Sequence, residues 1–412
     1  MTSSTPAFNH PVDTASGRAA TVTFDHVTKR YAGNASTAPG AVEDLSLEVP
    51  AGKICVLVGP SGCGKTTSLK MVNRLIEPTS GRILIDGADI ARRDVTELRR
   101  SIGYVIQQVG LFPHQTIGEN VATVPRLLGW AEDRRRARVD ELIRLVGLDP
   151  EIHRDRYPAQ LSGGERQRVG VARALAADPP VMLMDEPFGA VDPIVRERLQ
   201  NEFLRLQADL AKTILFVTHD IDEAIKMGDL VAVFQTGGVV AQYAAPAEML
   251  ANPASDFVAR FVGTDRGLKR LSLFRVGELE LSSVVTAPIG GDGSIVRRVA
   301  HEQPFEHVLV VDADQRPIGW VHRDHLTHGA ITAEAVESTS PLLDRRTTLK
   351  DALSMLLDAD VQAGIVTDRT GAVRGMITVA EIAALMREGD AKPLDPTQRA
   401  AADAADADDE RG

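Results

Sequence analysis

The order of apolar and polar positions predicts alternating strands and helices through the first 245 residues. Short strands are expected at 21–24 and 45–49, where apolar and polar residues alternate, and at 54–58, which is apolar on both faces. Farther along, the apolar runs 181–184 and 213–218 are each followed by a helical pattern. Such alternation predicts a parallel sheet with helices on both faces, which is an α/β fold.

Between and after these strands, other patterns predict further elements. Residues 110–160 are expected to be mostly helical with interruptions, and a helix is expected at 165–177, before Asp178 and two prolines. The apolar strands 230–234 and 239–243 flank a short Gly-containing turn, which predicts a hairpin.

An internal repeat marks a change of character beyond about residue 265. The segment 309–326 aligns with 365–382, so that Asp312 matches Asp368 and Gly319 matches Gly375. Each copy is predicted to contain a strand, a polar turn, a strand and a helix. The alternative is a chance alignment of two unrelated hairpins.

Composition narrows the functional class. The chain of 412 residues has a formal net charge of -11 and a pI near 5.5, which argues against nucleic-acid binding through a basic surface. Two cysteines, Cys55 and Cys63, suggest neither a disulfide nor a zinc framework, and a reducing cytoplasm is expected. No signal peptide is found, so residues 1–20 are expected to be a disordered leader. No apolar run is long enough to span a membrane. Residues 390–412 are rich in Ala and Asp and are expected to be a disordered acidic tail.

A phosphate-binding loop follows the strand at 54–58. The stretch GPSGCGKTT at 59–67 satisfies the spacing G-x-x-x-x-G-K-[ST] and leads into a helix. Glycines let backbone N–H groups turn toward phosphate oxygens, Lys65 reaches the β- and γ-phosphates, and the Thr66 hydroxyl binds Mg²⁺. The residues expected to bind ATP here are Gly59, Pro60, Ser61, Gly62, Cys63, Gly64, Lys65, Thr66 and Thr67.

Two carboxylates end the apolar strand at 181–184. Asp185 is placed to reach the Mg²⁺ shell beside Thr66, and Glu186 is placed to act as a base or to anchor the attacking water. The alternative is that both residues merely begin a turn before Pro187.

The stretch LSGGERQRVGVARAL at 161–175 adds a second anion site, because Ser162, Gly163 and Gly164 open a helix. It resembles the signature motif of ABC-type ATPases, with Glu165 where many members carry glutamine. The resemblance implies a P-loop ABC-type ATPase domain with a parallel sheet core, an antiparallel β subdomain and a helical subdomain. It also implies a head-to-tail homodimer that holds two ATP molecules between its subunits.

Four more positions match this family. The resemblance implies that Tyr31 stacks on adenine, that Gln107 contacts Mg²⁺ and faces a membrane partner, that Asp192 crosses the dimer interface, and that His219 contacts the γ-phosphate. The implied catalytic residues are therefore Glu186, His219 and Gln107, and the implied Mg²⁺ ligands are Thr66, Gln107 and Asp185.

The stretches 185–207, 217–229 and 246–266 resemble the ATPases of quaternary-amine uptake systems, which import glycine betaine, choline, carnitine or proline. This implies an ATPase domain at 21–265 on the cytoplasmic face of the membrane, two integral-membrane permease subunits and an extracytoplasmic solute-binding protein. The repeat resembles a tandem of CBS modules at 266–389, where a nucleotide or an ion is a candidate ligand. The usual Ser/Thr-x-x-Asp ribose contact is absent, because the second copy has Glu381 after Thr378.

Two alternatives remain open. An importer of another solute, such as an amino acid, would use the same ATPase. A non-transport ABC ATPase is a different class, but such proteins typically carry long coiled coils or two cassettes in one chain, and neither pattern is found in the sequence.

Overall fold

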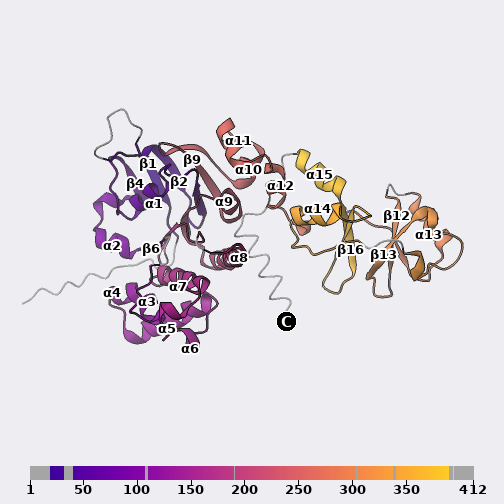
Figure 1. Ribbon diagram of the computed structural model, residues 1–412, viewed down its shortest axis with the longest axis horizontal. Helices are drawn as coiled ribbons and strands as arrows, with labels where there is room; N and C mark the ends of the chain where they lie inside the picture. Colours follow the sequence, from indigo (N-terminus) through magenta and orange to yellow (C-terminus); the bar gives the residue numbers. More distant parts are fainter. Residues whose placement is uncertain are drawn as a thin grey trace, which may run out of the picture. The chain divides into compact units, whose positions relative to one another are not determined.

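The computed structural model describes residues 19–31, 40–106, 110–189, 191–302, 305–336, 340–388 and 393. The chain divides into two compact units, which meet in the sequence between Ala245 and Pro246. Figure 1 labels the elements of both units. Each unit is described separately below.

A six-stranded sheet forms the centre of the first unit. Its strands, in spatial order, are β10 (Val239–Ala244), β9 (Leu230–Gln235), β3 (Ile54–Val58), β8 (Thr213–Val217), β7 (Val181–Asp185) and β6 (Ile102–Val105). All neighbours pair in parallel except β9 and β10, which form the predicted antiparallel hairpin. The predicted strands at 54–58, 181–184 and 213–218 are therefore neighbours in one sheet, and their carboxyl ends share one edge.

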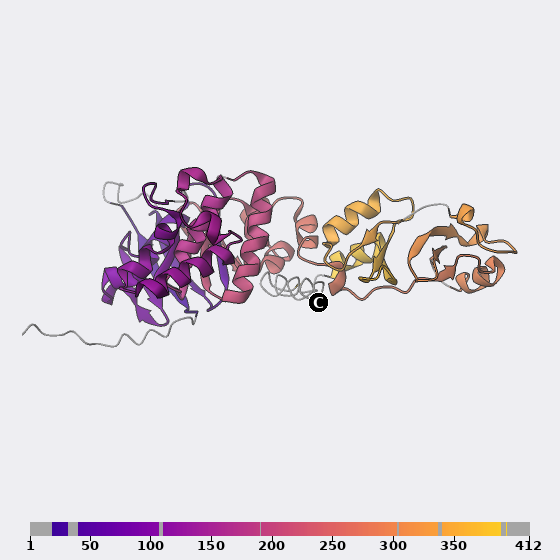
Figure 2. The same ribbon diagram turned by 90° about the horizontal axis from the view of Figure 1, so that it is seen from below.

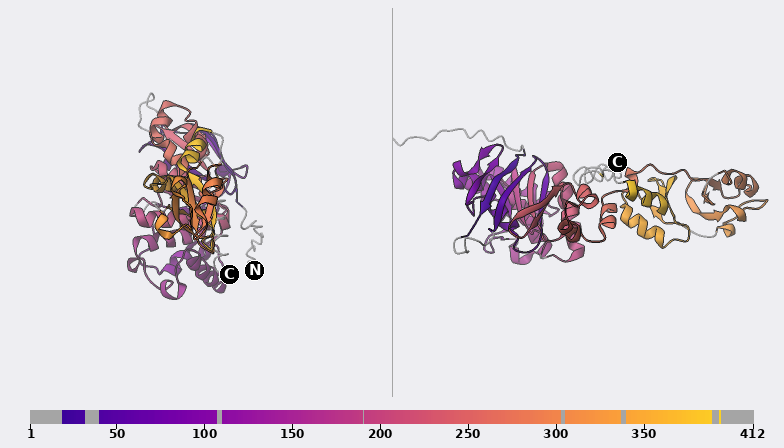
Figure 3. Two further views of the ribbon diagram at one scale, coloured as in Figure 1. Left: turned by 90° about the vertical axis from the view of Figure 1, so that its right-hand side faces the viewer. Right: turned by 90° about the horizontal axis from the view of Figure 1, so that it is seen from above.

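A second, antiparallel sheet contains the strands predicted near residues 21 and 45. Its order is β2 (Val42–Val49), β1 (Val22–Lys29), β4 (Ser80–Ile85) and β5 (Ala88–Asp89). The right-hand view of Figure 3 shows these indigo strands side by side. This is the antiparallel β subdomain that the family resemblance implies.

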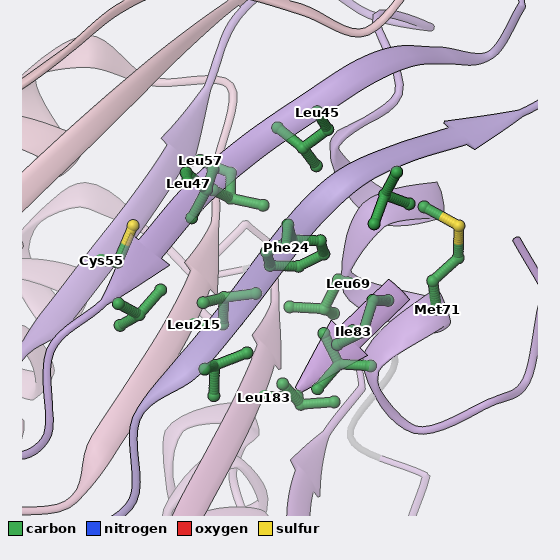
Figure 4. Packing of buried hydrophobic residues seen from close by; sticks show 14 of the residues in the cluster. Phe24, Leu45, Leu47, Cys55, Leu57, Leu69, Met71, Ile83, Leu183 and Leu215 are labelled. Atoms are coloured by element: carbon green, nitrogen blue, oxygen red, sulfur yellow. The ribbon is translucent and has the colours of Figure 1, made fainter. Parts of the chain in front are cut away.

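The main core of the unit lies between the two sheets. Phe24 and Leu45 of the antiparallel sheet are at most 1% exposed and pack toward Leu57, Leu183 and Leu215 of the parallel sheet (Figure 4). Helix α1 contributes Leu69 and Met71 to the same cluster. The expectation of helices on both faces of the parallel sheet is thus met only in part. Much of one face is covered by the antiparallel sheet, because the apolar side of that sheet must also be buried.

Helices cover the rest of this unit. They are α1 (Lys65–Val72), α2 (Val95–Arg100), α3 (Ile117–Val121), α4 (Thr123–Leu127), α5 (Glu132–Leu145), α6 (Pro150–His153), α7 (Gly163–Leu175), α8 (Pro193–Leu210) and α9 (Ile221–Met227). Figure 1 shows α3 to α7 gathered at one side of the unit. Helices α3 to α6 account for the predicted helical region at 110–160, and together with α7 they form a helical subdomain.

The second compact unit begins at Pro246. It includes α10 (Pro246–Ala251) and α11 (Asp256–Val262), and α10 lies against α12 (Arg266–Leu271). The domain boundary expected at residue 265 stays a prediction. The other helices of this unit are α13 (Gly293–Ala300), α14 (Leu349–Leu357) and α15 (Val379–Glu388).

Each copy of the predicted repeat belongs to its own three-stranded sheet, and the two sheets have the same strand arrangement. The first contains β11 (Thr286–Pro288), β12 (His307–Val311) and β13 (Pro317–His322), and the second contains β14 (Leu342–Leu343), β15 (Ala363–Thr367) and β16 (Val373–Thr378). In each copy the first pair is parallel and the second antiparallel. Figure 2 shows the orange first copy and the yellow second copy as neighbouring parts of this unit.

The aligned residues occupy equivalent positions. Asp312 accepts hydrogen bonds from the backbone N–H groups of Asp314 and Arg316, at 2.9 and 2.8 Å. Asp368 does the same for Thr370 and Ala372, at 2.9 and 3.1 Å. An aspartate that accepts from the backbone two residues ahead stabilises a turn, so the shared residue sets the shared hairpin geometry.

The two copies differ after their last strand. The second continues into α15, as predicted, but the first forms only the short 3-10 helix η4 (Arg323–His325), so the helix predicted there is wrong. In the second copy Thr378 and Glu381 form reciprocal hydrogen bonds that begin the helix. In the first copy, Gly329 follows soon after with φ +122°, a conformation that ends regular structure.

No helix within the described ranges combines the length and apolar character that crossing a membrane requires. The remaining 3-10 helices are η1 (Ile90–Arg92), η2 (Pro158–Gln160), η3 (Val276–Glu278) and η5 (Ala333–Ala335). The expected leader at 1–20 and tail at 390–412 lie outside the described residues, apart from 19, 20 and 393.

Candidate active site

The phosphate loop connects β3 to α1 and depends on glycine at two positions. A Cβ atom on Gly64, which has φ +102°, would lie 2.2 Å from the carbonyl oxygen of Ala41. A Cβ atom on Gly59, which has φ +153°, would lie 2.3 Å from the carbonyl oxygen of Phe234. Side chains cannot approach backbone this closely, so only glycine allows the loop to follow this path.

Lys65 is buried within this loop. Its Nζ donates hydrogen bonds to the carbonyl oxygens of Gly59 at 2.7 Å and Pro60 at 2.9 Å, and it lies 3.6 Å from Cys63 Sγ. Cys63 and Cys55 are both free and buried thiols. Pro60, Ser61 and Gly62 are exposed, so the tip of the loop is open to a ligand.

Thr66 and Asp185 supply the oxygen atoms of a candidate magnesium site. The Thr66 hydroxyl donates to Asp185 Oδ1 at 3.0 Å, although the two residues belong to α1 and β7. Burial raises the pKa of Asp185, whereas the Thr66 hydrogen bond and the charge of Lys70 lower it. Mg²⁺ prefers oxygen ligands and is usually held by one or two carboxylates together with nucleotide phosphates, so this pair fits the ion.

The described part of the chain contains no cluster of three His, Cys, Asp or Glu side chains that could hold a metal by themselves. A magnesium ion at Thr66 and Asp185 would take further ligands from a nucleotide, from water and, as the sequence predicts, from Gln107.

Glu186 turns away from the strand that precedes it. Its backbone has φ +45°, a left-handed conformation that is uncommon for glutamate. The conformation is held from both sides, because the Glu186 N–H donates to the Val217 carbonyl at 3.0 Å and its carbonyl accepts from the Gly189 N–H at 3.2 Å. Strained backbone of this kind is often found at functional sites.

The turn brings Glu186 to His219. The distance from Glu186 Oε1 to His219 Nδ1 is 3.4 Å, and the His219 side chain is 63% exposed. His219 follows β8, the neighbour of β7, so the two residues come from adjacent carboxyl ends of the parallel sheet. The structure therefore brings Lys65, Thr66, Asp185, Glu186 and His219 to one edge of the sheet.

The predicted signature residues do not belong to this edge of the sheet but line a cavity elsewhere in the unit. Ser162, Gly163 and Gly164 lie with Asp192 around a space of about 230 Å³ between α7 and α8. A Cβ atom on Gly164 would lie 3.3 Å from Val195 Cγ1, so a small residue suits this position. Ser162 and Asp192 each begin a helix: Ser162 Oγ accepts from the Glu165 N–H, and Asp192 Oδ1 accepts from the Val195 N–H.

Glu165 completes a capping box at the start of α7. Its Oε2 accepts from the Ser162 N–H at 2.7 Å, and its Oε1 lies 3.4 Å from His153 Nε2. The backbone hydrogen bond from Ser162 is the main reason that the pKa of Glu165 is lowered. The box begins α7 at Gly163, directly after its N-cap Ser162.

We expect Glu165→Gln to lower the free energy of unfolding by up to about 1 kcal/mol at pH 7, because the amide keeps the hydrogen bond but loses the charge at the helix N-terminus. A lowered carboxyl pKa stabilises the fold above the ordinary value of 4.5 and stops doing so as the pH falls through the lowered value. The difference between wild type and variant should therefore shrink from pH 7 to pH 4 in urea unfolding. A difference that stays constant with pH would contradict this role.

Of two further predicted residues, the structure describes Tyr31 but not Gln107. Tyr31 follows the end of β1 and is 45% exposed, with Lys29 Nζ 5.2 Å from its ring centre. An exposed ring can stack on a base. Gln107 lies outside the described residues, and its role stays a prediction.

The sequence interpretation missed the residues behind His219. Thr218 is 1% exposed, and Glu223 and Gln200 are 8% and 5% exposed. Gln200 Nε2 donates to Glu223 Oε1 at 2.9 Å. The sequence did offer one signal: Glu223 occupies an inward-facing position of α9, and ionisable side chains are rarely buried without partners.

Comparison with known proteins identifies the family of the chain. The family model for ABC transporters matches residues 42–189. The osmoprotectant import ATP-binding protein OsmV of Salmonella typhimurium is 45% identical over 370 residues, which cover 89% of this chain and 97% of that protein. The glycine betaine/carnitine/choline transport ATP-binding protein OpuCA of Bacillus subtilis is 43% identical over 364 residues, with coverage of 87% and 94%.

Among solved structures, cbiO1 from Clostridium perfringens, part of the ABC transporter complex cbiONQ, is similar to this chain. The TM-score is 0.51 at 29% sequence identity, and the match covers 58% of this chain and 93% of that one. The similarity to OsmV and OpuCA, by contrast, extends well into the C-terminal unit.

Proposed function

Because the chain belongs to the family of ABC transporter ATP-binding subunits that serve osmoprotectant uptake, we propose that it hydrolyses ATP to drive import of glycine betaine or a related quaternary amine. The observation that carries this proposal is the extent of the similarity. Relatives named for osmoprotectant, glycine betaine, carnitine or choline transport align with this chain over 87–89% of its length, not over the ATPase core alone.

The chemistry follows from the edge of the parallel sheet. Backbone N–H groups of the loop and Lys65 hold the phosphates, and Thr66 with Asp185 would hold the Mg²⁺ that neutralises their charge. Glu186, 3.4 Å from His219, accepts a proton from the attacking water, and His219 orients that water and the γ-phosphate. Gln107 is proposed to complete the magnesium shell.

A head-to-tail homodimer would complete each site. Ser162 and Gly164 lie in a cavity with Asp192 rather than in the phosphate loop, which supports their use by the nucleotide of the partner subunit. Ile194, next to this cavity at the start of α8, is 84% exposed. Asp192 is proposed to cross the interface, where Ile194 would be covered.

The other partners follow from the importer class. We infer two integral-membrane permease subunits, an extracytoplasmic solute-binding protein and a place on the cytoplasmic face of the membrane. The C-terminal unit is inferred to be a CBS pair. Glu381 already accepts hydrogen bonds from the Thr378 N–H and hydroxyl at 2.6 and 2.9 Å, so a nucleotide there would need a contact other than the usual ribose one.

Uptake by the reconstituted transporter tests this function. The chain, its two permease subunits and the binding protein are placed in proteoliposomes, and uptake of radiolabelled glycine betaine, choline, carnitine, proline and methionine is compared. We expect uptake of at least one quaternary amine that requires Mg-ATP and is lost in Lys65→Ala. Uptake of methionine alone would favour an amino-acid importer. Failure to co-purify with any membrane subunit would favour a non-transport ATPase.

A further inference from the structure

Helices α8 and α9 are joined by two polar contacts near the candidate site. Arg196 and Gln200 lie one turn apart on α8, so they occupy the same face. Arg196 Nη1 lies 3.9 Å from Asp220 Oδ2, and Gln200 Nε2 donates to Glu223 Oε1 at 2.9 Å. Asp220 and Glu223 belong to the first turn of α9, where Asp220 is the N-cap.

The contact between Gln200 and Glu223 is linked by further hydrogen bonds to the residues on either side of His219. Glu223 also accepts a hydrogen bond from the Thr218 side chain. The Thr218 hydroxyl accepts from the Asp220 N–H at 3.1 Å, so His219 lies between two residues of this network. Gln200, Glu223 and Thr218 are all at least 92% buried, and their hydrogen bonds are therefore little weakened by water.

Burial of the Glu223 carboxyl group has an energetic cost. Burial raises its pKa, whereas the hydrogen bonds from Thr218 and Gln200 and the charge of Arg196 lower it. Asp220 raises it further, and Lys226, on the same helix, is paired with Glu197 at 3.7 Å. A leucine or methionine at position 223 would avoid this cost. Unlike those side chains, the Glu223 carboxylate can accept hydrogen bonds from Gln200 and Thr218 at the same time.

The N-terminal end of α8, where Arg196 and Gln200 also lie, is part of the proposed dimer interface. Asp192 is its N-cap, and Arg196 and Gln200 follow at intervals of one turn. A shift of the Asp192 loop would therefore move the first two turns of a rigid helix that holds Asp220 and Glu223. Resting on the proposed function, we propose that Gln200 and Glu223 are positioning residues that couple docking of the partner subunit at Asp192 to the position of His219.

Two substitutions separate this coupling from a structural role. Glu223→Gln replaces one acceptor by a donor that faces Gln200 Nε2 or the Thr218 hydroxyl. The exchange variant Gln200→Glu with Glu223→Gln restores both hydrogen bonds: the amide at position 223 donates to the carboxylate at position 200, which reverses the wild-type bond, and its oxygen still accepts from the Thr218 hydroxyl. Glu197→Gln is the matched control, because Glu197 also connects α8 to α9 but is 74% exposed and pairs with Lys226.

The assay is ATP hydrolysis by the full chain, with ATP binding and thermal unfolding measured on the same samples. We expect Glu223→Gln to lower kcat about tenfold while the Kd for ATP changes by less than about twofold, because binding residues are untouched and only His219 is misplaced. The exchange variant should recover kcat to within about threefold of wild type. Glu197→Gln should hydrolyse ATP like wild type.

Coupling to the interface is tested by combining Asp192→Ala with Glu223→Gln. If both act through one path, the double variant should lose little more activity than the more damaged single variant. Multiplicative losses would overturn the coupling. Wild-type kcat in Glu223→Gln, or no recovery in a folded exchange variant, would overturn the positioning role. Because hydrolysis is measured without solute, these outcomes do not depend on which solute the transporter imports.

Discussion

Replacing Glu186 with glutamine is expected to reduce ATP turnover roughly 10²- to 10⁴-fold, the usual range for loss of a general base. Glutamine cannot accept the proton of the attacking water, yet its size preserves the left-handed turn at φ +45° and the contact with the strand of His219. ATP binding should remain intact, because the phosphate loop and Asp185 are unchanged. The variant should therefore accumulate as a dimer with Mg-ATP.

Phosphate release measures the turnover, and size exclusion with and without Mg-ATP measures the dimer. Glu197→Gln makes the same chemical change at an exposed position on the same unit and should behave like wild type. Turnover near the wild-type rate in Glu186→Gln would assign the base to another residue. A variant that fails to bind ATP would show that Glu186 acts in nucleotide binding instead.

A mixed dimer of Lys65→Ala and Ser162→Arg chains is expected to bind one ATP, whereas each variant alone binds almost none. Lys65 belongs to the phosphate loop and Ser162 to the cavity beside Asp192. In a head-to-tail dimer each site takes its loop from one chain and its Ser162 from the other. One site of the mixed dimer therefore carries both changes and the other carries neither.

Differently tagged chains allow the mixed dimer to be isolated before bound ATP is counted. Thr116→Arg is a suitable control, because Thr116 begins α3 with the same kind of capping box that Ser162 forms at α7. Mixed with Lys65→Ala, it should give a dimer that binds one ATP only at the site with an intact loop. Its homodimer should bind two. A Lys65→Ala and Ser162→Arg dimer with two or no bound ATP would contradict the head-to-tail arrangement.

Much of the candidate site could be predicted because its residues lie at fixed spacings around strand ends. Gly59, Gly64 and Lys65 share a single loop, and Asp185 and Glu186 end a single apolar strand, so local sequence determines their positions. That Thr66 reaches Asp185 follows from the parallel order of β3, β8 and β7. The pattern of apolar strands predicted the sheet for the same reason.

What the sequence did not reveal depends on contacts between distant segments. Nothing near residue 265 indicates that α10 packs against α12 in one compact unit that begins at Pro246. The helix predicted after β13 fails because its start lacks the Thr378–Glu381 type of box. Glu223 shows its importance only once Gln200, 23 residues earlier, is seen to donate to it.

The contacts of Lys65 have a consequence for what happens between turnovers. The loop carbonyls of Gly59 and Pro60 already occupy the hydrogens of this buried ammonium. Arrival of a phosphate therefore exchanges one set of acceptors for another, without first removing water from a bare charge. The loop that would hold the phosphate thus also supplies the acceptors to which Lys65 returns, so the ammonium is paired on both sides of the exchange.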